Sequence, residues 1–510
     1  MAVYAKAALC LAVFGAIYPT LQVGADYSDN DARVLILGAG AAGLQAARSL
    51  HDAGVDDFII IEAADRIGGR VDNTQFAGMN VELGPTWALP EESRVVDIVR
   101  KLGLSNRASD YESLIFRSGA TGENVSVEAF ENYDAIEPAK EELGSLRDQM
   151  RANSEIPDMS QRSALRVGGW IPETATERAV EWFEFDITFG DSPETTSTKQ
   201  TESIGTEYWM TDAGGLKQIF GEVAGFLEEP EYINHTRLNQ KVTSIDYSND
   251  ISMVVTCEDG TRYIGEYVLV TFSLGVLQHD LVEFIPPLPE WKDVEINKFQ
   301  MTSYTLIYIS FPSKFWDDEE WILHTSERRG YYPAFFNFQA EGFFPDGTPL
   351  LLAFVTGDEA KRVEAQSEEE TKAEIQEVLS GMYGDSIPNA LDILVTDWYE
   401  NPLTKGSYSN WPVEVSTECF WKLQSRVHRV FFGGEATSYD YFGTIDGALR
   451  SGEREADKII GCMSNFKECP AFGFEGLECE TDDGNPASTL HFNVFISSII
   501  IGLFLKSFSE

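Results

Sequence analysis

A glycine-rich turn directly after an apolar segment is the feature that most constrains the fold of this chain. Residues 34–37 read Val-Leu-Ile-Leu, and the turn that follows carries a G-x-G-x-x-G pattern at Gly38, Gly40 and Gly43. In such a unit the first glycine permits a tight turn, the second lets the backbone approach a pyrophosphate, and the third lets helix and strand pack closely. The N-terminus of the helix also attracts phosphate. The pattern predicts a dinucleotide-binding unit.

An acidic residue stands where such a unit binds ribose. Residues 58–61 read Phe-Ile-Ile-Ile and end on Glu62. A carboxylate at this spacing accepts hydrogen bonds from ribose hydroxyls. Because a glycine-rich turn alone also occurs in ordinary loops, the two apolar segments and the acid decide in favour of an adenine dinucleotide.

Two further motifs distinguish a flavin from a nicotinamide cofactor. Residues 62–70 read Glu-Ala-Ala-Asp-Arg-Ile-Gly-Gly-Arg, so that paired glycines permit close backbone approach and Arg70 supplies a fixed positive charge. Residues 430–438 read Val-Phe-Phe-Gly-Gly-Glu-Ala-Thr-Ser, and residues 443–452 read Gly-Thr-Ile-Asp-Gly-Ala-Leu-Arg-Ser-Gly. These motifs resemble those of the flavin-dependent amine oxidase family. The resemblance implies FAD, which we expect to be noncovalent because no cysteine lies near residues 441–444.

The family resemblance assigns cofactor roles to several other residues. It implies that Arg70 approaches the cofactor, that Glu435 binds the ribityl chain and that Val242 lies beside the adenine. Thr444 follows Gly443 at the N-terminus of a helix that would face the flavin.

Landmarks between these motifs resemble the secreted plant-type polyamine oxidases in particular. They are the segments 81–87, 182–186, 304–316 and 405–412, and the similarity runs from about residue 33 to about residue 462. The resemblance implies hydride transfer from the carbon beside a secondary amine, release of an imine, and return of the electrons to oxygen as peroxide. It also implies catalytic roles for Tyr408, Trp87 and Phe189.

Four positions depart from the pattern where it matters for catalysis. Leu306 stands where the family has a lysine that holds a water near the flavin, and an alkyl side chain cannot do so. Thr444 replaces a tyrosine of the aromatic wall, which leaves Tyr408 as the remaining member of that pair. Leu89 and Thr188 replace two acids that draw a polyamine into its tunnel.

Nearby charged residues could replace the missing acids and lysine, although their positions do not match the family pattern. Glu91 and Glu92 lie close in sequence to Leu89, and Asp186 lies close to Thr188. Lys298 has the wrong offset to replace the missing lysine and is expected to be a solvated loop residue.

Three interpretations of these losses compete. The favoured one is a working oxidase with a changed substrate, such as a less charged or N-acylated amine. The others are a flavin dehydrogenase that reacts slowly with oxygen and a flavin-bound scaffold without turnover. The residues of the active site, and not the fold, decide among these three functions.

The order of the motifs predicts an α/β fold with two domains. We expect an FAD-binding Rossmann-like domain with a parallel sheet, assembled from residues 26–109, 203–285 and 396–465, because flavin motifs occur at both ends of the chain. Residues 110–202 and 286–395 would form a mixed α+β substrate-binding domain.

The N-terminus predicts a secreted or cell-surface glycoprotein. Residues 1–25 carry an early Lys6, an apolar stretch and a small-residue cleavage site, which is typical of a signal peptide. Export would make the sequons at Asn124 and Asn234 available for glycosylation.

The cysteines that follow the predicted signal peptide suit an oxidising compartment. Cys462, Cys469 and Cys479 cluster in and before a segment at 466–490, where one disulfide would stabilise an extension, whereas Cys257 is expected to be a buried thiol. Their spacing is not that of a zinc site, and with six histidines in the chain we expect no metal centre.

The hydrophobic tail at 491–510 indicates a surface anchor. Its apolar run is shorter than the ~20 residues of a spanning helix, and small residues followed by a polar spacer resemble a lipid-anchor signal. A short transmembrane anchor or a docked strand are the alternatives.

The formal net charge of −45 argues against nucleic acid as a partner, because the phosphate backbone would be repelled. The expected partners are a small amine substrate and molecular oxygen. The acidic surface also leaves open a matrix or scaffold role that involves weak calcium binding.

Overall fold

The computed structural model describes residues 30–89, 92–202, 207–344, 347 and 349–464, all within one compact unit. The predicted signal peptide (1–25), the cysteine-containing extension (466–490) and the hydrophobic tail (491–510) lie outside these residues.

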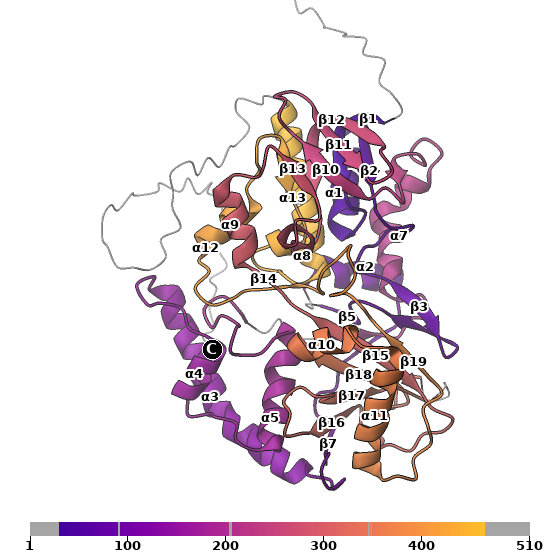
Figure 1. Ribbon diagram of the computed structural model, residues 1–510, viewed down its shortest axis with the longest axis vertical. Coiled ribbons are helices and arrows are strands. Elements are labelled where there is room, and N and C mark those ends of the chain that lie inside the picture. The colour runs from indigo at the N-terminus through magenta and orange to yellow at the C-terminus, as the bar shows by residue number, and fades with distance from the viewer. Residues whose placement is uncertain (1–29, 90–91, 203–206, 345–346, 348, 465–510) are drawn as a thin grey trace, which may run out of the picture. The chain divides into compact units, whose positions relative to one another are not determined.

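The glycine-rich turn belongs to an eight-stranded sheet (Figure 1). Its central strand β1 (Asp31–Leu37) lies between the parallel strands β2 (Phe58–Ile61) and β12 (Arg262–Val270). The order is β13-β10-β11-β12-β1-β2-β9, with β21 also paired to β12. The other strands are β9 (Thr236–Arg237), β10 (Val242–Asp246), β11 (Met253–Cys257), β13 (Glu283–Ile285) and β21 (Val430–Phe432).

This sheet is mixed, whereas the sequence predicts a parallel one. Strands β10, β11 and β12 form an antiparallel meander beside the parallel centre. The chain reverses between β11 and β12 through Gly260, which adopts φ +86° and donates its N–H to the Cys257 carbonyl over 2.9 Å. A tight turn of this kind joins antiparallel neighbours without the crossover that parallel strands need.

Helices cover both faces of this sheet, so its central strand is apolar throughout. Val34 and Ile36 pack with the helix layer that contains α1 (Ala41–Asp52) and α13 (Ile445–Ser464). Leu35 and Leu37 point to the opposite face and pack with residues of the meander and of α8 (Leu274–Gln278). Burial on both faces explains the unbroken apolar run.

A second sheet of six strands has the order β19-β15-β18-β17-β16-β7 and is antiparallel except between β16 and β7. Its strands are β7 (Leu114–Ser118), β15 (Tyr304–Ser310), β16 (Trp321–Thr325), β17 (Ala334–Asn337), β18 (Leu350–Thr356) and β19 (Asp392–Val395). One face packs on α10 (Gly357–Glu364) and α11 (Glu368–Tyr383). The other packs on α3 (Ser126–Ala152), α4 (Gln161–Val167) and α5 (Ala175–Glu181).

Shorter elements lie outside the two large sheets. The strands are β3 (Asn73–Phe76), β4 (Met79–Glu82), β5 (Trp87–Ala88), β6 (Asn106–Ala108), β8 (Tyr208–Met210), β14 (Gln300–Met301) and β20 (Ser409–Asn410). The helices are α2 (Arg94–Leu102), α6 (Ile187–Phe189), α7 (Ile219–Ala224), α9 (Glu290–Lys298), α12 (Thr417–Gln424) and the π-helix Trp182–Asp186.

The predicted α/β class is confirmed. Strands of the eight-stranded sheet come from separated segments at 31–61, 236–285 and 430–432, and strands of the six-stranded sheet come from 114–118 and 304–395. The boundaries of the two expected domains stay a prediction.

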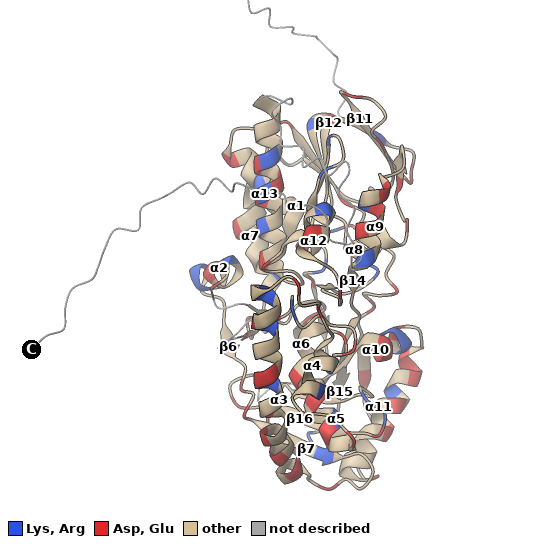
Figure 2. Ribbon diagram, turned by 90° about the vertical axis from the view of Figure 1, so that its left-hand side faces the viewer, with Lys and Arg blue, Asp and Glu red and all other residues tan. Residues whose placement is uncertain are grey.

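Charged residues are spread over the outer helices rather than collected in one patch. Figure 2 shows acidic residues interspersed with basic ones along α3, α11 and α13. Among the described helices, none combines the length and the apolar character needed to cross a bilayer.

Candidate active site and cofactor site

A cavity of about 800 Å³ connects the two sheets. Its lining begins at Gly38 and Glu62, at the carboxyl ends of β1 and β2, and extends to Tyr304 and Leu306 on β15. Ligands of α/β sheets bind at the carboxyl ends of the strands. The volume suits a small-molecule site.

Ten of the eleven residues that the sequence nominates line this cavity. They are Gly38, Gly40, Glu62, Arg70, Val242, Glu435 and Thr444 for the cofactor, and Trp87, Phe189 and Tyr408 for the amine. The eleventh, Gly43, lies behind the turn.

The three glycines of the turn are needed for different reasons. Gly38 adopts φ +115°, a conformation that side chains disfavour. A Cβ on Gly43 would lie 1.9 Å from the Gly38 carbonyl oxygen, so close helix–strand packing excludes it. A Cβ on Gly40 would have Gly69 Cα as its nearest neighbour, at 3.9 Å. Packing within the protein does not require this glycine, and the space beside it fits the pyrophosphate of a dinucleotide.

The ribose acid is held in place by the backbone. The carboxylate of Glu62 accepts hydrogen bonds from the N–H groups of Ala39 (2.7 Å) and Ala64 (2.8 Å). Each carboxylate oxygen can accept a second hydrogen bond, so Glu62 keeps capacity for ribose hydroxyls. Val242 is buried on β10 and lines the same end of the cavity.

Arg70 and Glu435 join the first and last flavin motifs. Arg70 Nη1 donates to Glu435 Oε1 over 3.0 Å and to the Ser407 carbonyl over 2.9 Å. The buried Glu435 carboxylate also accepts from Ser409 Oγ (2.5 Å) and from the Gly443 N–H (2.8 Å). It therefore fixes three chain segments around the cavity.

Thr444 caps the helix that closes the cofactor end. Its hydroxyl accepts from the Gly447 N–H over 3.0 Å and donates to the Tyr441 carbonyl over 2.8 Å. Position 444 therefore supplies a helix N-terminus rather than an aromatic wall.

The other end of the cavity is aromatic. Trp87 Nε1 donates to Ser109 Oγ over 2.9 Å, and the Tyr408 hydroxyl donates to the Thr188 carbonyl over 3.1 Å. These bonds fix both rings at the cavity wall, which Phe189 completes.

Strand β15 presents Tyr304 and Leu306 to the cavity, because residues i and i+2 of a strand share a face. Leu306 is 3% exposed, and its alkyl side chain lines the cavity at the position where the family resemblance implies a lysine. The buried Tyr304 hydroxyl forms no hydrogen bond with any described residue, and burial raises its pKa well above the usual value. Lys298 is not part of the lining and lies 3.3 Å from Glu295.

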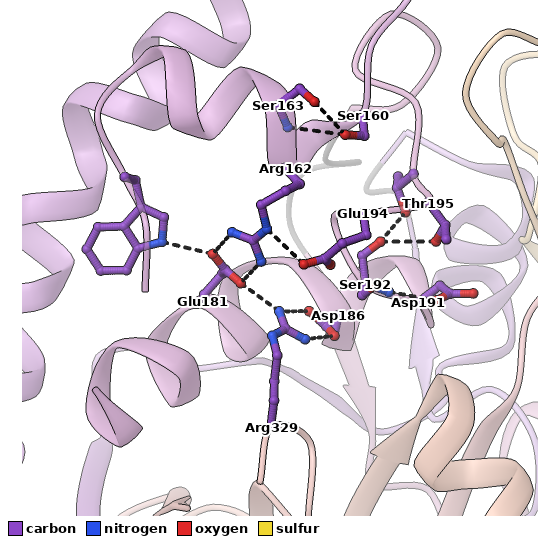
Figure 3. A network of polar contacts seen from close by, with 12 residues as sticks. Ser160, Arg162, Ser163, Glu181, Asp186, Asp191, Ser192, Glu194, Thr195 and Arg329 are labelled. Carbon is purple, nitrogen blue, oxygen red and sulfur yellow. Dashed lines mark hydrogen bonds and ion pairs between the residues drawn. The ribbon is translucent and has the colours of Figure 1, made fainter. Parts of the chain in front are cut away.

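Asp186, one of the suggested replacement acids, is engaged by an arginine (Figure 3). Its Oδ2 accepts from Arg329 Nη2 over 2.7 Å, and Arg329 also contacts the fully buried Glu181 over 2.8 Å. Arg162 binds the same Glu181 carboxylate through both terminal nitrogens. Asp186 therefore has its countercharge within the protein and is not part of the cavity lining, which argues against this replacement hypothesis. Glu92 is exposed outside the lining, and Glu91 lies outside the described residues.

The sequence interpretation missed Glu207. It lines the cavity immediately before β8, and its Oε2 accepts a hydrogen bond from the Tyr111 hydroxyl. Burial raises the pKa of the Glu207 carboxyl, and the Tyr111 hydrogen bond lowers it by less. No motif marks this residue, because only strand pairing brings it to the site.

A cavity that joins a dinucleotide turn to an aromatic pocket defines a flavoenzyme of the amine oxidase type, and sequence comparison agrees. Residues 41–460 match the family model of flavin containing amine oxidoreductases. The chain belongs to this family, and FAD is its cofactor.

Among its relatives are two plant proteins. The chain is 37% identical over 458 residues to polyamine oxidase 1 of Zea mays, covering 84% of this chain and 90% of the maize protein. It is 34% identical over 495 residues to polyamine oxidase 6 of Oryza sativa subsp. japonica, covering 91% and 96%. A solved structure of putrescine oxidase bound to putrescine superposes with a TM-score of 0.67 at 21% identity, covering 84% of this chain and 99% of that one. This last similarity supports the fold.

Proposed function

We propose that this protein oxidises a polyamine or a related secondary amine to an imine and passes the two electrons to oxygen, which forms hydrogen peroxide. The observation that carries the proposal is the continuity of the cavity. It runs from Gly40 and Glu62 to the aromatic wall of Trp87, Phe189 and Tyr408.

The chain's own residues bind, orient and exclude water. FAD supplies the hydride acceptor when it is bound, and the protein supplies its surroundings. Arg70, held by Glu435, places a positive charge at the cofactor, while Trp87 and Tyr408 orient an alkylamine between rings fixed by hydrogen bonds. Leu306 offers no hydrogen bond to a water molecule.

Leu306 supports a second candidate, a flavin dehydrogenase that reacts slowly with oxygen. The missing lysine would position water near the flavin during oxygen reduction, and the buried alkyl group that replaces it cannot. The two candidates share amine oxidation and differ in the electron acceptor.

The visible spectrum of the purified protein distinguishes these candidates. Spermine, spermidine and their acetylated forms are added without oxygen, and air is then readmitted. Bleaching of the flavin followed by rapid recovery and peroxide release is expected of the oxidase, whereas slow recovery indicates the dehydrogenase. A bound flavin that none of these amines reduces would exclude polyamine oxidation.

We also propose a secreted or cell-surface location. The exposed side chains of Asn124 and Asn234 support it, because both belong to sequons. The disulfide bond at Cys462 further supports an oxidising compartment, while Cys257 is a buried thiol. Expression through a secretory pathway tests this: a glycosidase should lower the apparent mass of wild type more than that of Asn124→Gln.

A further inference from the structure

Strand pairing places Glu207 opposite a position where the family resemblance implies an acid. Strands β5 and β8 are antiparallel, with Trp87 paired to Trp209 and Ala88 to Tyr208. One further step of this register sets Leu89 opposite Glu207. Residues directly opposite each other in an antiparallel pair point to the same face, and both of these line the cavity. A carboxylate is therefore present on this wall, immediately before the neighbouring strand β8.

The other buried or paired acids of the cavity are already engaged by the protein. Glu62 binds two backbone N–H groups, and Glu435 is paired with Arg70. Glu202 lies 2.8 Å from Arg151. Asp440 also belongs to the lining but is exposed to solvent.

Glu207 differs because its partner is neutral. It accepts from the Tyr111 hydroxyl and forms no ion pair with any described residue. A half-buried carboxylate with a neutral partner keeps capacity for a cation, and ion pairing there is screened less than at an open surface. The structure thus leaves one inner acid without a countercharge.

The surroundings of Glu207 suit an ammonium group. Among the rings near it, Trp87 lines the cavity beside Leu89 and meets Trp209 edge to face with centroids 4.9 Å apart. Aromatic faces attract cations. Burial is the main cause that raises the pKa of Tyr304 and of Tyr408, and the negative charge of Glu207 is one of the smaller causes for both hydroxyls, which line the amine end of the cavity.

We propose that Glu207 binds a protonated nitrogen of the substrate, remote from the carbon that is oxidised, and thereby selects amines with two or more nitrogens. The naming of an amine substrate rests on the proposed function. The binding of a cation at this wall does not.

Calorimetric titration of the flavin-loaded protein with octane-1,8-diamine tests the proposal without turnover. Glu207→Gln should weaken diamine binding roughly tenfold or more, because a charge-assisted hydrogen bond is lost. Binding of the uncharged octane-1,8-diol should not change. The matched control is Glu112→Gln, an exposed acid next to Tyr111 outside the cavity, which should leave both affinities as in wild type. Equal diamine affinity in wild type and Glu207→Gln would overturn the proposal.

A compensating variant tests the strand relation itself. Leu89→Glu added to Glu207→Gln should restore most of the diamine affinity. If the double variant binds the diamine as weakly as Glu207→Gln does, the claim that the acid has moved across the strand pair is overturned. If Glu207→Gln does not retain flavin, wild type alone decides the matter. It should prefer spermidine over N-methylbutylamine by at least about tenfold in kcat/KM, and equal values would overturn the proposal.

The two hypotheses can fail separately. If wild type binds the diamine through Glu207 but no amine bleaches its flavin, the cation site stands and the proposed oxidation fails. If amines bleach the flavin equally in wild type and Glu207→Gln at every concentration, oxidation stands and the cation site fails.

Discussion

The two ends of the cavity differ in how far apart their residues lie along the sequence. At the cofactor end, Gly38, Gly40 and Glu62 lie where their spacing in one strand–turn–helix unit places them. At the amine end, Leu89 and Leu306 stand where the family resemblance implies polar residues, and the inner acid Glu207 comes from a distant segment, immediately before β8. Backbone geometry fixes a phosphate site within a few consecutive residues. An ammonium site needs only a carboxylate on the wall, so its position along the chain is free to change.

The two glycines of the turn give the sharpest test of the cofactor end. Gly43→Ala should destabilise the fold on the order of 4 kcal/mol, because its Cβ would lie 1.9 Å from the Gly38 carbonyl oxygen. Gly40→Ala should fold and lose flavin, because its Cβ has room in the protein but occupies the phosphate space. Circular dichroism and the flavin-to-protein ratio measure both. A flavin-saturated Gly43→Ala protein would contradict this account of the turn.

The buried ion-pair network is the corresponding test at the amine end. Arg329→Met leaves Asp186 and Glu181 short of a cation and should cost about 3–5 kcal/mol. It should also raise KM, because the π-helix that carries Asp186 leads directly to Thr188 and Phe189.

The neighbouring arginine provides the control. The Arg328 side chain is 53% exposed and pairs with Glu359, so Arg328→Met should cost at most about 1 kcal/mol. Chemical denaturation compares the two variants. Equal midpoints would show that the network does not stabilise this wall.

Glu82 lies outside the cavity lining, at the end of β4, and should make stability depend on pH. Burial raises the pKa of its carboxyl from 4.5 to about 8, and its Oε2 has no partner among the described residues. Between these pH values the folded protein holds a proton that the unfolded chain has released. The free energy of unfolding should therefore fall as pH rises from about 5 to about 8, by at most about 1.4 kcal/mol per pH unit.

The variant Glu82→Gln cannot ionise and should lose this dependence. The difference in thermal midpoint between Glu82→Gln and wild type should therefore favour the variant more at pH 8 than at pH 5. The exposed Glu112→Gln should follow wild type at both values. Parallel profiles for wild type and Glu82→Gln would mean that Glu82 is ionised in the folded protein.

Restoring the missing lysine should have the smallest effect. Leu306→Lys should speed reoxidation of the reduced protein by about tenfold, which is less than the roughly 10²- to 10⁴-fold that a positioned general acid or base contributes. Leu306→Met keeps the alkyl character and should not. Stopped-flow mixing with oxygenated buffer measures the rates, and equal rates would remove the reason for the dehydrogenase candidate.

What could be predicted from the sequence follows the same division. The α/β class and the position of the dinucleotide turn follow from consecutive residues, because the strand, the turn and the acid belong to one local unit. The antiparallel meander could not be predicted in this way, because a short turn at Gly260 determines that β11 and β12 run in opposite directions. The pairing of Asp186 with Arg329 joins residues 143 positions apart, and the position of Glu207 depends on the β5–β8 register. Only the folded chain supplies such relations.

The packing of α13 on α1 also determines when during synthesis the protein can first hold its cofactor. Gly452 lies so close to Ala42 that a Cβ there would be 2.0 Å from the Ala42 carbonyl oxygen, and β21 is added beside β12. During synthesis the N-terminal strand–turn–helix leaves the ribosome long before α13 and β21 have been made. The growing polypeptide must therefore keep an apolar helix face uncovered until residue 464 has emerged, and a nascent chain stalled at residue 429 should bind chaperones rather than flavin.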